Sequence, residues 1–136
     1  MATQRTISII GALEEVAENA IRELSERNFN LLLFYKESDE SKRPQSSYAT
    51  HAANIEWISC PREASWEADA VILAIPVGEQ QEIASDIRPV TTGKPVIDIR
   101  NGDNNRHALQ QLLPDSIVYC VDAKCAGELL IDFFKQ

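Results

Sequence analysis

Short apolar runs alternate with amphipathic helical patterns along the whole of this 136-residue chain. The expected strands occupy residues 6–10, 31–35, 55–59, 70–75, 95–99 and 117–121. The expected helices occupy residues 12–27, 78–87, 104–113 and 126–134, and residues 61–67 form a short helix or a turn. Such alternation is typical of parallel βαβ units, and six strands fit the doubly wound order 3-2-1-4-5-6. We therefore expect one three-layer α/β domain, residues 1–136, with a mostly parallel six-stranded sheet.

The apolar residues indicate which faces are covered. The consecutive apolar residues 31–34 are typical of a strand buried on both faces. One stripe of the first helix is apolar at helical spacing, and it consists of Leu13, Val16, Ala17, Ala20, Ile21 and Leu24. Residues 36–54 are the most polar part of the chain, and both a helix that begins at Pro44 and a loop are compatible with them.

The segment from Thr6 to Ala17 has the pattern of a strand, a tight turn and a helix. In dinucleotide-binding folds this turn carries the pattern Gly-x-Gly-x-x-Gly/Ala. Gly11 takes the first position, but Leu13 and Val16 stand where the second and third glycines are expected. The second glycine lets the backbone approach a pyrophosphate, and the third lets helix and strand pack closely. A branched side chain at residue 13 therefore obstructs a phosphate.

Two carboxylates follow in the same turn. Glu14 and Glu15 fall at the start of the expected helix, where free N–H groups attract anions. As ordinary first-turn residues they stabilise the helix by about 0.3–1 kcal/mol each. They also repel a pyrophosphate, by roughly 4 kcal/mol per unit charge at ~4 Å and an effective dielectric near 20 before screening. We therefore expect weak binding of NAD(H) or NADP(H), with a shifted pose of the cofactor as the alternative.

Three stretches resemble the N-terminal domain of coenzyme F420-dependent NADP oxidoreductases, a pattern shared with pyrroline-5-carboxylate reductases. They are Thr-Ile-Ser-Ile-Ile-Gly-Ala at 6–12, Ala-Asp-Ala-Val-Ile-Leu-Ala-Ile-Pro at 68–76 and Gly-Lys-Pro-Val-Ile-Asp at 93–98. The resemblance implies a Rossmann fold with NADP as its cofactor. In that family the first turn is similar to Gly-Ala-Gly-Asn-Met-Gly, so Gly11 and Ala12 match, whereas Leu13 and Glu14 do not.

The resemblance also implies further cofactor contacts. Residues Ile75, Pro76 and Val77 would border the nicotinamide ribose, although Pro76 is equally well explained as a strand terminator. Lys36 follows the second strand, where a basic residue meets the 2′-phosphate of NADP. It favours NADP over NAD as a ligand, and the alternative is a surface charge that leaves the strand.

Other polar residues stand near expected strand ends. Asp98 lies inside an apolar strand and needs a hydrogen-bond partner. Arg100, Asn101 and Asp103 follow it in a polar cluster, in which Arg100 and Asn101 either cap backbone groups or contact a ligand. After the sixth strand, Asp122 and Lys124 form either an ion pair or an N-cap and a surface charge. His51 and His107 are far apart, and we find no metal-binding or Ser-His-Asp pattern.

The net charge of −8 argues against nucleic acid or an anionic membrane as a partner. No apolar run reaches membrane-spanning length, and no signal peptide precedes the first strand. The cysteines, Cys60, Cys120 and Cys125, are odd in number and lack metal-like spacing. We therefore expect a cytoplasmic protein whose cysteines are reduced and mostly buried.

The apolar C-terminal helix either packs on the sheet or covers a partner subunit, and Trp57 and Trp66 are expected in the core or an interface. These features lead to one principal hypothesis, a homodimeric, non-catalytic binding or assembly domain with impaired cofactor binding. The alternative is an NADP-dependent oxidoreductase whose substrate site is completed by another subunit. A third hypothesis is a site for a smaller nucleotide, such as a coenzyme A or adenosine fragment.

Overall fold

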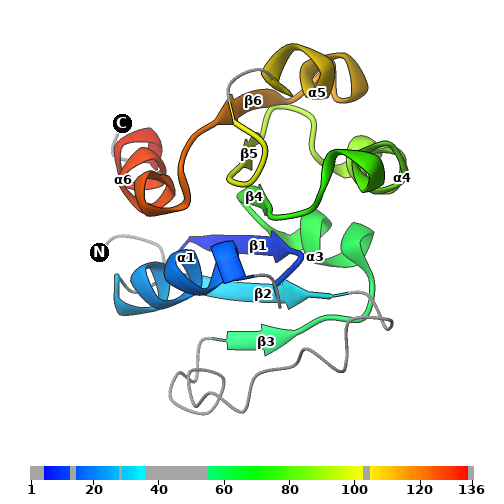
Figure 1. Cartoon of the computed structure of the whole chain (residues 1–136). Helices are drawn as coiled ribbons and strands as arrows, with labels where there is room; N and C mark the ends of the chain where they lie inside the picture. Colours follow the sequence, from blue (N-terminus) through cyan, green and yellow to red (C-terminus); the bar gives the residue numbers. More distant parts are fainter. Residues whose placement is uncertain (1–4, 13–14, 28, 36–54, 103–104, 135–136) are drawn as a thin grey trace.

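The computed structural model describes residues 5–12, 15–27, 29–35, 55–102 and 105–134. Its six-stranded sheet has the order β3-β2-β1-β4-β5-β6, and every neighbouring pair is parallel (Figure 1). The strands are β1 (Thr6–Ile10), β2 (Asn30–Phe34), β3 (Ile55–Trp57), β4 (Ala70–Leu73), β5 (Pro95–Asp98) and β6 (Ile117–Cys120). The doubly wound order predicted from the alternating pattern is confirmed.

The helices stand where the sequence predicts them, with small differences at their ends. They are α1 (Glu15–Glu26), α3 (Pro61–Glu67), α4 (Val77–Ile87), α5 (Arg106–Leu112) and α6 (Ala123–Phe134), and a short 3-10 helix, η2 (Arg88–Val90), follows α4. Residues 61–67, for which a short helix and a turn were both expected, form a helix. The C-terminal helix begins three residues earlier than expected, at Ala123.

Alternate strand residues face two separate helical layers. Ile72 and Ile97 belong to the hydrophobic cluster that includes the buried residues of α1 and α6. Val71 and Val96, one residue away, belong to the cluster under α4 and α5. Figure 1 accordingly shows α1 and α6 on one side of the sheet and α3 and α4 on the other. Because both faces are covered, the central strands are apolar at consecutive positions.

The neighbouring strands β1 and β4 lead to opposite faces of the sheet. Ile9 pairs with Leu33 of β2 and also with Ile72 of β4. The chain continues from β1 into α1 on one face and from β4 into α4 on the other. In open α/β sheets, such a switch point opens a crevice at the carboxyl ends of the strands, where ligands bind.

The C-terminal helix packs on the sheet, which was one of its two expected positions. Ala126 and Leu130 are fully buried in the same cluster as the apolar stripe of α1. Gly127 allows a close approach, since an added Cβ would lie 2.7 Å from a carboxylate oxygen of Glu23 on α1. Coverage of a partner subunit by this helix stays a prediction.

Two expectations concern burial. Trp57 is half-buried against the core, whereas Trp66 is 68% exposed on α3, so the core is ruled out for Trp66 and its position in an interface stays a prediction. The three cysteines are free, yet only Cys120 is buried, Cys60 is half-buried and Cys125 is exposed. None of the helices in the described part of the chain is long and apolar enough to cross a membrane.

Candidate functional site

The turn after β1 is built around Gly11. Its φ is +89°, and an added Cβ would lie 2.9 Å from the carbonyl oxygen of Ala74, so glycine meets both a conformational and a steric demand here. The backbone N–H groups of Gly11 and Ala12 both donate to the carbonyl oxygen of Phe34, each at 2.9 Å. These contacts join the end of β1 to the ends of β2 and β4. Two N–H groups of the turn are therefore already satisfied within the protein.

The start of α1 carries negative charge. Glu15 is its first residue and is exposed, and Glu18 also lies in the first turn. These carboxylates complement the partial positive charge of the helix N-terminus. Val16 is half-buried and packs against the core. Of the predicted cofactor contacts, Leu13, Glu14 and Lys36 lie outside the described residues, as do His51 and Asp103.

The residues after β4 lie at the carboxyl end of the sheet, as predicted. Ile75 is buried, Pro76 occupies the N-cap position of α4, and Val77 begins that helix with 55% of its surface exposed. The side-chain amide of Asn101 donates to the carbonyl oxygen of Ile75 at 2.9 Å. The loops after β4 and β5 are therefore tied together at this edge.

Asp98 is fully buried at the end of β5 and accepts several hydrogen bonds. One oxygen accepts from the side-chain amides of Gln80 and Asn105, both at 3.0 Å. The other accepts from the backbone N–H groups of Arg100 (2.9 Å) and Asn101 (3.1 Å). Asn105 also donates to Gln80 at 2.7 Å. The expectation that Asp98 needs hydrogen-bond partners is confirmed. Of the residues that follow it, Asn101 caps a backbone carbonyl group, that of Ile75.

Gln80 and Asn105 were not predicted from the sequence as partners of Asp98. Gln80 precedes buried Ile83 and Ala84 by three and four residues, so helical spacing does place it on the covered face of α4. Asn105 stands at the N-cap position of α5, where its side chain turns to Gln80 and Asp98 rather than to the helix backbone.

The remaining polar candidates that the structure describes lie apart from the network of Asp98. His107 is exposed on α5, with Nε2 3.2 Å from the side-chain nitrogen of Gln111. Asp122 and Lys124 are both described and exposed, and no ion pair joins them. Within the described ranges, no group of histidine, cysteine and carboxylate side chains is arranged to hold a metal ion.

Lys94 lies away from this edge, near the amino ends of β5 and β6. Its ammonium donates to the carbonyl oxygens of Ser65 (2.9 Å) and Trp66 (3.1 Å) in the last turn of α3. Burial lowers the pKa of Lys94 below its ordinary value of 10.5, and the nearby charge of Asp69 opposes that shift. Lys94 therefore caps a helix and takes no part in the candidate site.

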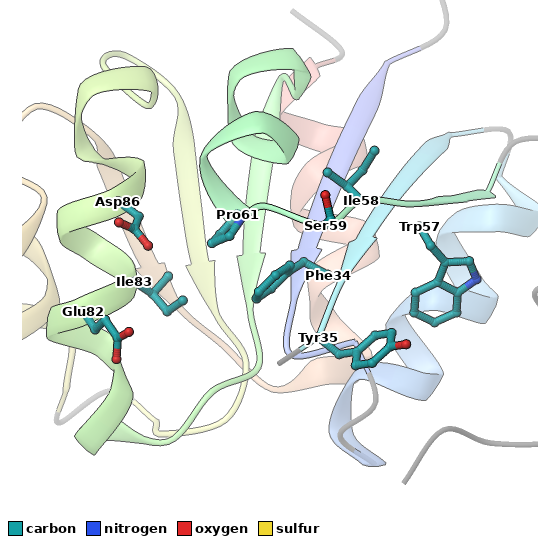
Figure 2. Close-up of a pocket in the computed structure, with 9 residues that line it drawn as sticks. All are labelled: Phe34, Tyr35, Trp57, Ile58, Ser59, Pro61, Glu82, Ile83 and Asp86. Atoms are coloured by element: carbon teal, nitrogen blue, oxygen red, sulfur yellow. The ribbon is translucent and has the colours of Figure 1, made fainter. Parts of the chain in front are cut away.

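A pocket of about 720 Å³ opens between α4 and the ends of β2 and β3 (Figure 2). Its nine lining residues are Phe34, Tyr35, Trp57, Ile58, Ser59, Pro61, Glu82, Ile83 and Asp86. The rings of Tyr35 and Trp57 meet edge to face, with centroids 5.5 Å apart and planes at 83°. Among the described residues that line the pocket, two are acidic and none is lysine, arginine or histidine. This pocket was not predicted from the sequence.

No protein-family model matches the sequence, and no curated protein matches it significantly. Solved structures do share its fold. An imine reductase variant from Myxococcus stipitatus in complex with NAD+ aligns with a TM-score of 0.67 and 14% identity, over 86% of this chain and 40% of that one. A PanE/ApbA family ketopantoate reductase from Ralstonia eutropha aligns with a TM-score of 0.63 and 21% identity, over 83% of this chain and 39% of that one.

The chain has the Rossmann-like α/β fold that these reductases share. An imine reductase from Bacillus cereus aligns equally well, with a TM-score of 0.65 and 16% identity over 86% of this chain and 39% of that one. The Rossmann fold that the family resemblance implied is thus confirmed. This Rossmann chain spans about 40% of the length of these reductases.

Proposed function

We propose that this chain is a reductase-type Rossmann domain with impaired cofactor binding, which acts as a non-catalytic binding or assembly domain. The proposal rests on the hydrogen bonds and the charge at the turn after β1. The N–H groups of Gly11 and Ala12 donate to Phe34, and α1 begins with the carboxylate of Glu15. A pyrophosphate approaching this turn meets negative charge and loses two donors.

The pocket beside β2 supports the same conclusion. In this fold the end of the second strand lies near the adenosine ribose, and a 2′-phosphate there calls for a basic partner. Glu82 and Asp86 are instead the charged residues of the lining. Like charges disfavour a phosphate at this end of the crevice. Lys36, which follows β2 in the sequence, is the residue that would offset this repulsion.

NADP is the dinucleotide that the resemblance favours, and solved neighbours of the same fold are complexed with NAD+ or NADP+. Gly11, Ala12 and residues 75–77 would border it, together with Leu13, Glu14 and Lys36. A bound reduced nicotinamide supplies a hydride. The residues at the first turn fit its pyrophosphate poorly, so no catalytic step is assigned to this chain.

A second candidate function is an NADP-dependent oxidoreductase whose substrate site is completed by another subunit. Its support is the fold, which is shared by imine reductases that are complexed with NAD+ or NADP+. Val77, half exposed at the carboxyl edge, offers an apolar contact for a second chain. In both cases we propose a homodimer, and the free cysteines agree with a cytoplasmic location.

Calorimetric titration with NADPH tests the principal proposal. We expect no saturable binding at low micromolar concentration, and saturable binding in that range contradicts impaired binding. A triple variant, Leu13→Gly, Glu14→Asn and Val16→Gly, restores the family pattern of the turn. If it gains affinity for NADPH while remaining folded, the turn alone is responsible. A thermal-shift series with NAD, NADP, coenzyme F420 and coenzyme A tests the smaller-nucleotide hypothesis.

A further inference from the structure

The pocket beside β2 is lined by apolar, aromatic and acidic side chains (Figure 2). The proposed function assigns no ligand to this combination. Its centre is apolar and consists of Phe34, Pro61 and Ile83. The aromatic pair of Tyr35 and Trp57 lies on the strand side. The carboxylates project from α4 on the opposite side. At about 720 Å³, the pocket falls within the usual range for small-molecule sites.

The two carboxylates lack a cationic partner within the described part of the chain. Glu82 and Asp86 are exposed, and neither takes part in the ion pairs found there. They are four residues apart on α4, so they share a helix face, where like charges destabilise each other. Ile83 anchors this part of α4 in the core, at 3% exposure. A positive charge placed between the carboxylates would relieve their repulsion.

The aromatic side of the pocket suits an apolar or cationic group. The edge-to-face contact of Tyr35 and Trp57 orients the two rings with respect to each other. Aromatic faces attract organic cations and pack well against flat apolar groups. Phe34 extends this surface toward Ile83. A ligand that spans the pocket therefore meets aromatic rings at one end and negative charge at the other.

We propose that this pocket binds an organic cation, specifically a primary amine attached to a flat apolar body. The apolar body lies against Phe34 and the aromatic pair, and the ammonium group donates to Glu82 and Asp86. A phosphorylated ligand has the wrong charge for Glu82 and Asp86, the charged residues among the described part of the lining. The proposed site does not involve the turn after β1.

Calorimetric and NMR titrations of the full chain with phenethylammonium test the proposal. We expect saturable binding, with shift changes at Trp57 and Ile83. Phenethyl alcohol has the same apolar body without the charge, and we expect its affinity to be lower by at least about tenfold. The double variant Glu82→Gln/Asp86→Asn is expected to lose about tenfold in affinity for the amine and none for the alcohol.

A matched control removes the same charge elsewhere. The variant Glu26→Gln/Asp132→Asn changes two exposed carboxylates on α1 and α6, across the sheet from the pocket, and is expected to bind the amine as the original protein does. Equal affinity for the amine and the alcohol would overturn the proposal, as would unchanged amine binding in the Glu82/Asp86 variant. If the protein binds adenosine but not the amine, and the Glu82/Asp86 variant binds adenosine equally well, the pocket is a nucleoside site and the proposal is wrong.

Discussion

The side-chain amide nitrogen of Gln80 lies 3.0 Å from a carboxylate oxygen of Asp98, and both residues are almost fully buried. This hydrogen bond joins α4 to the end of β5 beneath the loops that form the carboxyl edge. Asn105 completes the arrangement by donating to both side chains. The network therefore fixes two loops of the candidate site relative to each other.

Asp98→Ala is expected to lower the free energy of unfolding by about 3 kcal/mol, because it leaves several buried donors without an acceptor. Asp98→Asn keeps the shape but directs an N–H group at neighbouring donors, and we expect a loss of about 1–2 kcal/mol. Urea denaturation followed by circular dichroism measures both. Asp132→Asn, an exposed carboxylate on α6, is the control. Equal stability of the Asp98 variants and the control would contradict the role of the network.

Gly11→Ala combines an unfavourable φ with a Cβ only 2.9 Å from the carbonyl oxygen of Ala74. Gly93 also has a positive φ, +75°, but an added Cβ there meets nothing within 4 Å. We expect Gly93→Ala to cost about 1 kcal/mol of unfolding free energy, from strain alone. Gly11→Ala is expected to cost about 3 kcal/mol, since backbone must shift as well. Similar losses in the two variants would show that the contact with Ala74 is unimportant.

Ser65→Ala is expected to stabilise the protein by about 1 kcal/mol. The Ser65 hydroxyl is fully buried in α3 and has no hydrogen-bond partner within the described part of the protein. Ser116 provides the opposite case, because its hydroxyl is buried and donates to the carbonyl oxygen of Thr91 at 2.9 Å. Ser116→Ala is expected to lose about 1 kcal/mol. Thermal melts of the two variants should therefore shift in opposite directions, and a lower melting temperature for Ser65→Ala would contradict this account.

Because of Lys94, we expect the free energy of unfolding to change with pH in the alkaline range. Burial lowers its pKa in the folded state below 10.5, so between the two pKa values the unfolded chain binds the extra proton. The contribution of Lys94 to stability therefore rises as pH increases through the folded pKa, and levels off above the unfolded one. Lys94→Met should lack this rise, whereas Lys124→Met, a change of an exposed residue on α6, should retain it. Urea melts between about pH 8 and pH 11 would show the difference, and parallel curves for all three proteins would refute it.

The apolar patterns were sufficient to predict the strand order. Central strands such as residues 70–73 are apolar throughout because helices cover both faces of the sheet. Helix ends were predicted less well, and the start of the last helix was placed three residues too late. The sequence left open whether Trp66 lies in the core or an interface, because residue type alone does not determine which side of a short helix faces water.

The sequence by itself determined the doubly wound sheet, the glycine at the first turn and the position of residues 75–77 at the carboxyl edge. These features depend on periodicity and on local backbone geometry, which neighbouring residues largely set. Only the tertiary structure decided that Gln80 and Asn105 bind Asp98, and that Tyr35, Trp57 and two carboxylates of α4 line one pocket. Side chains from separate elements meet only after the helices pack on the sheet, so no local pattern encodes their contacts.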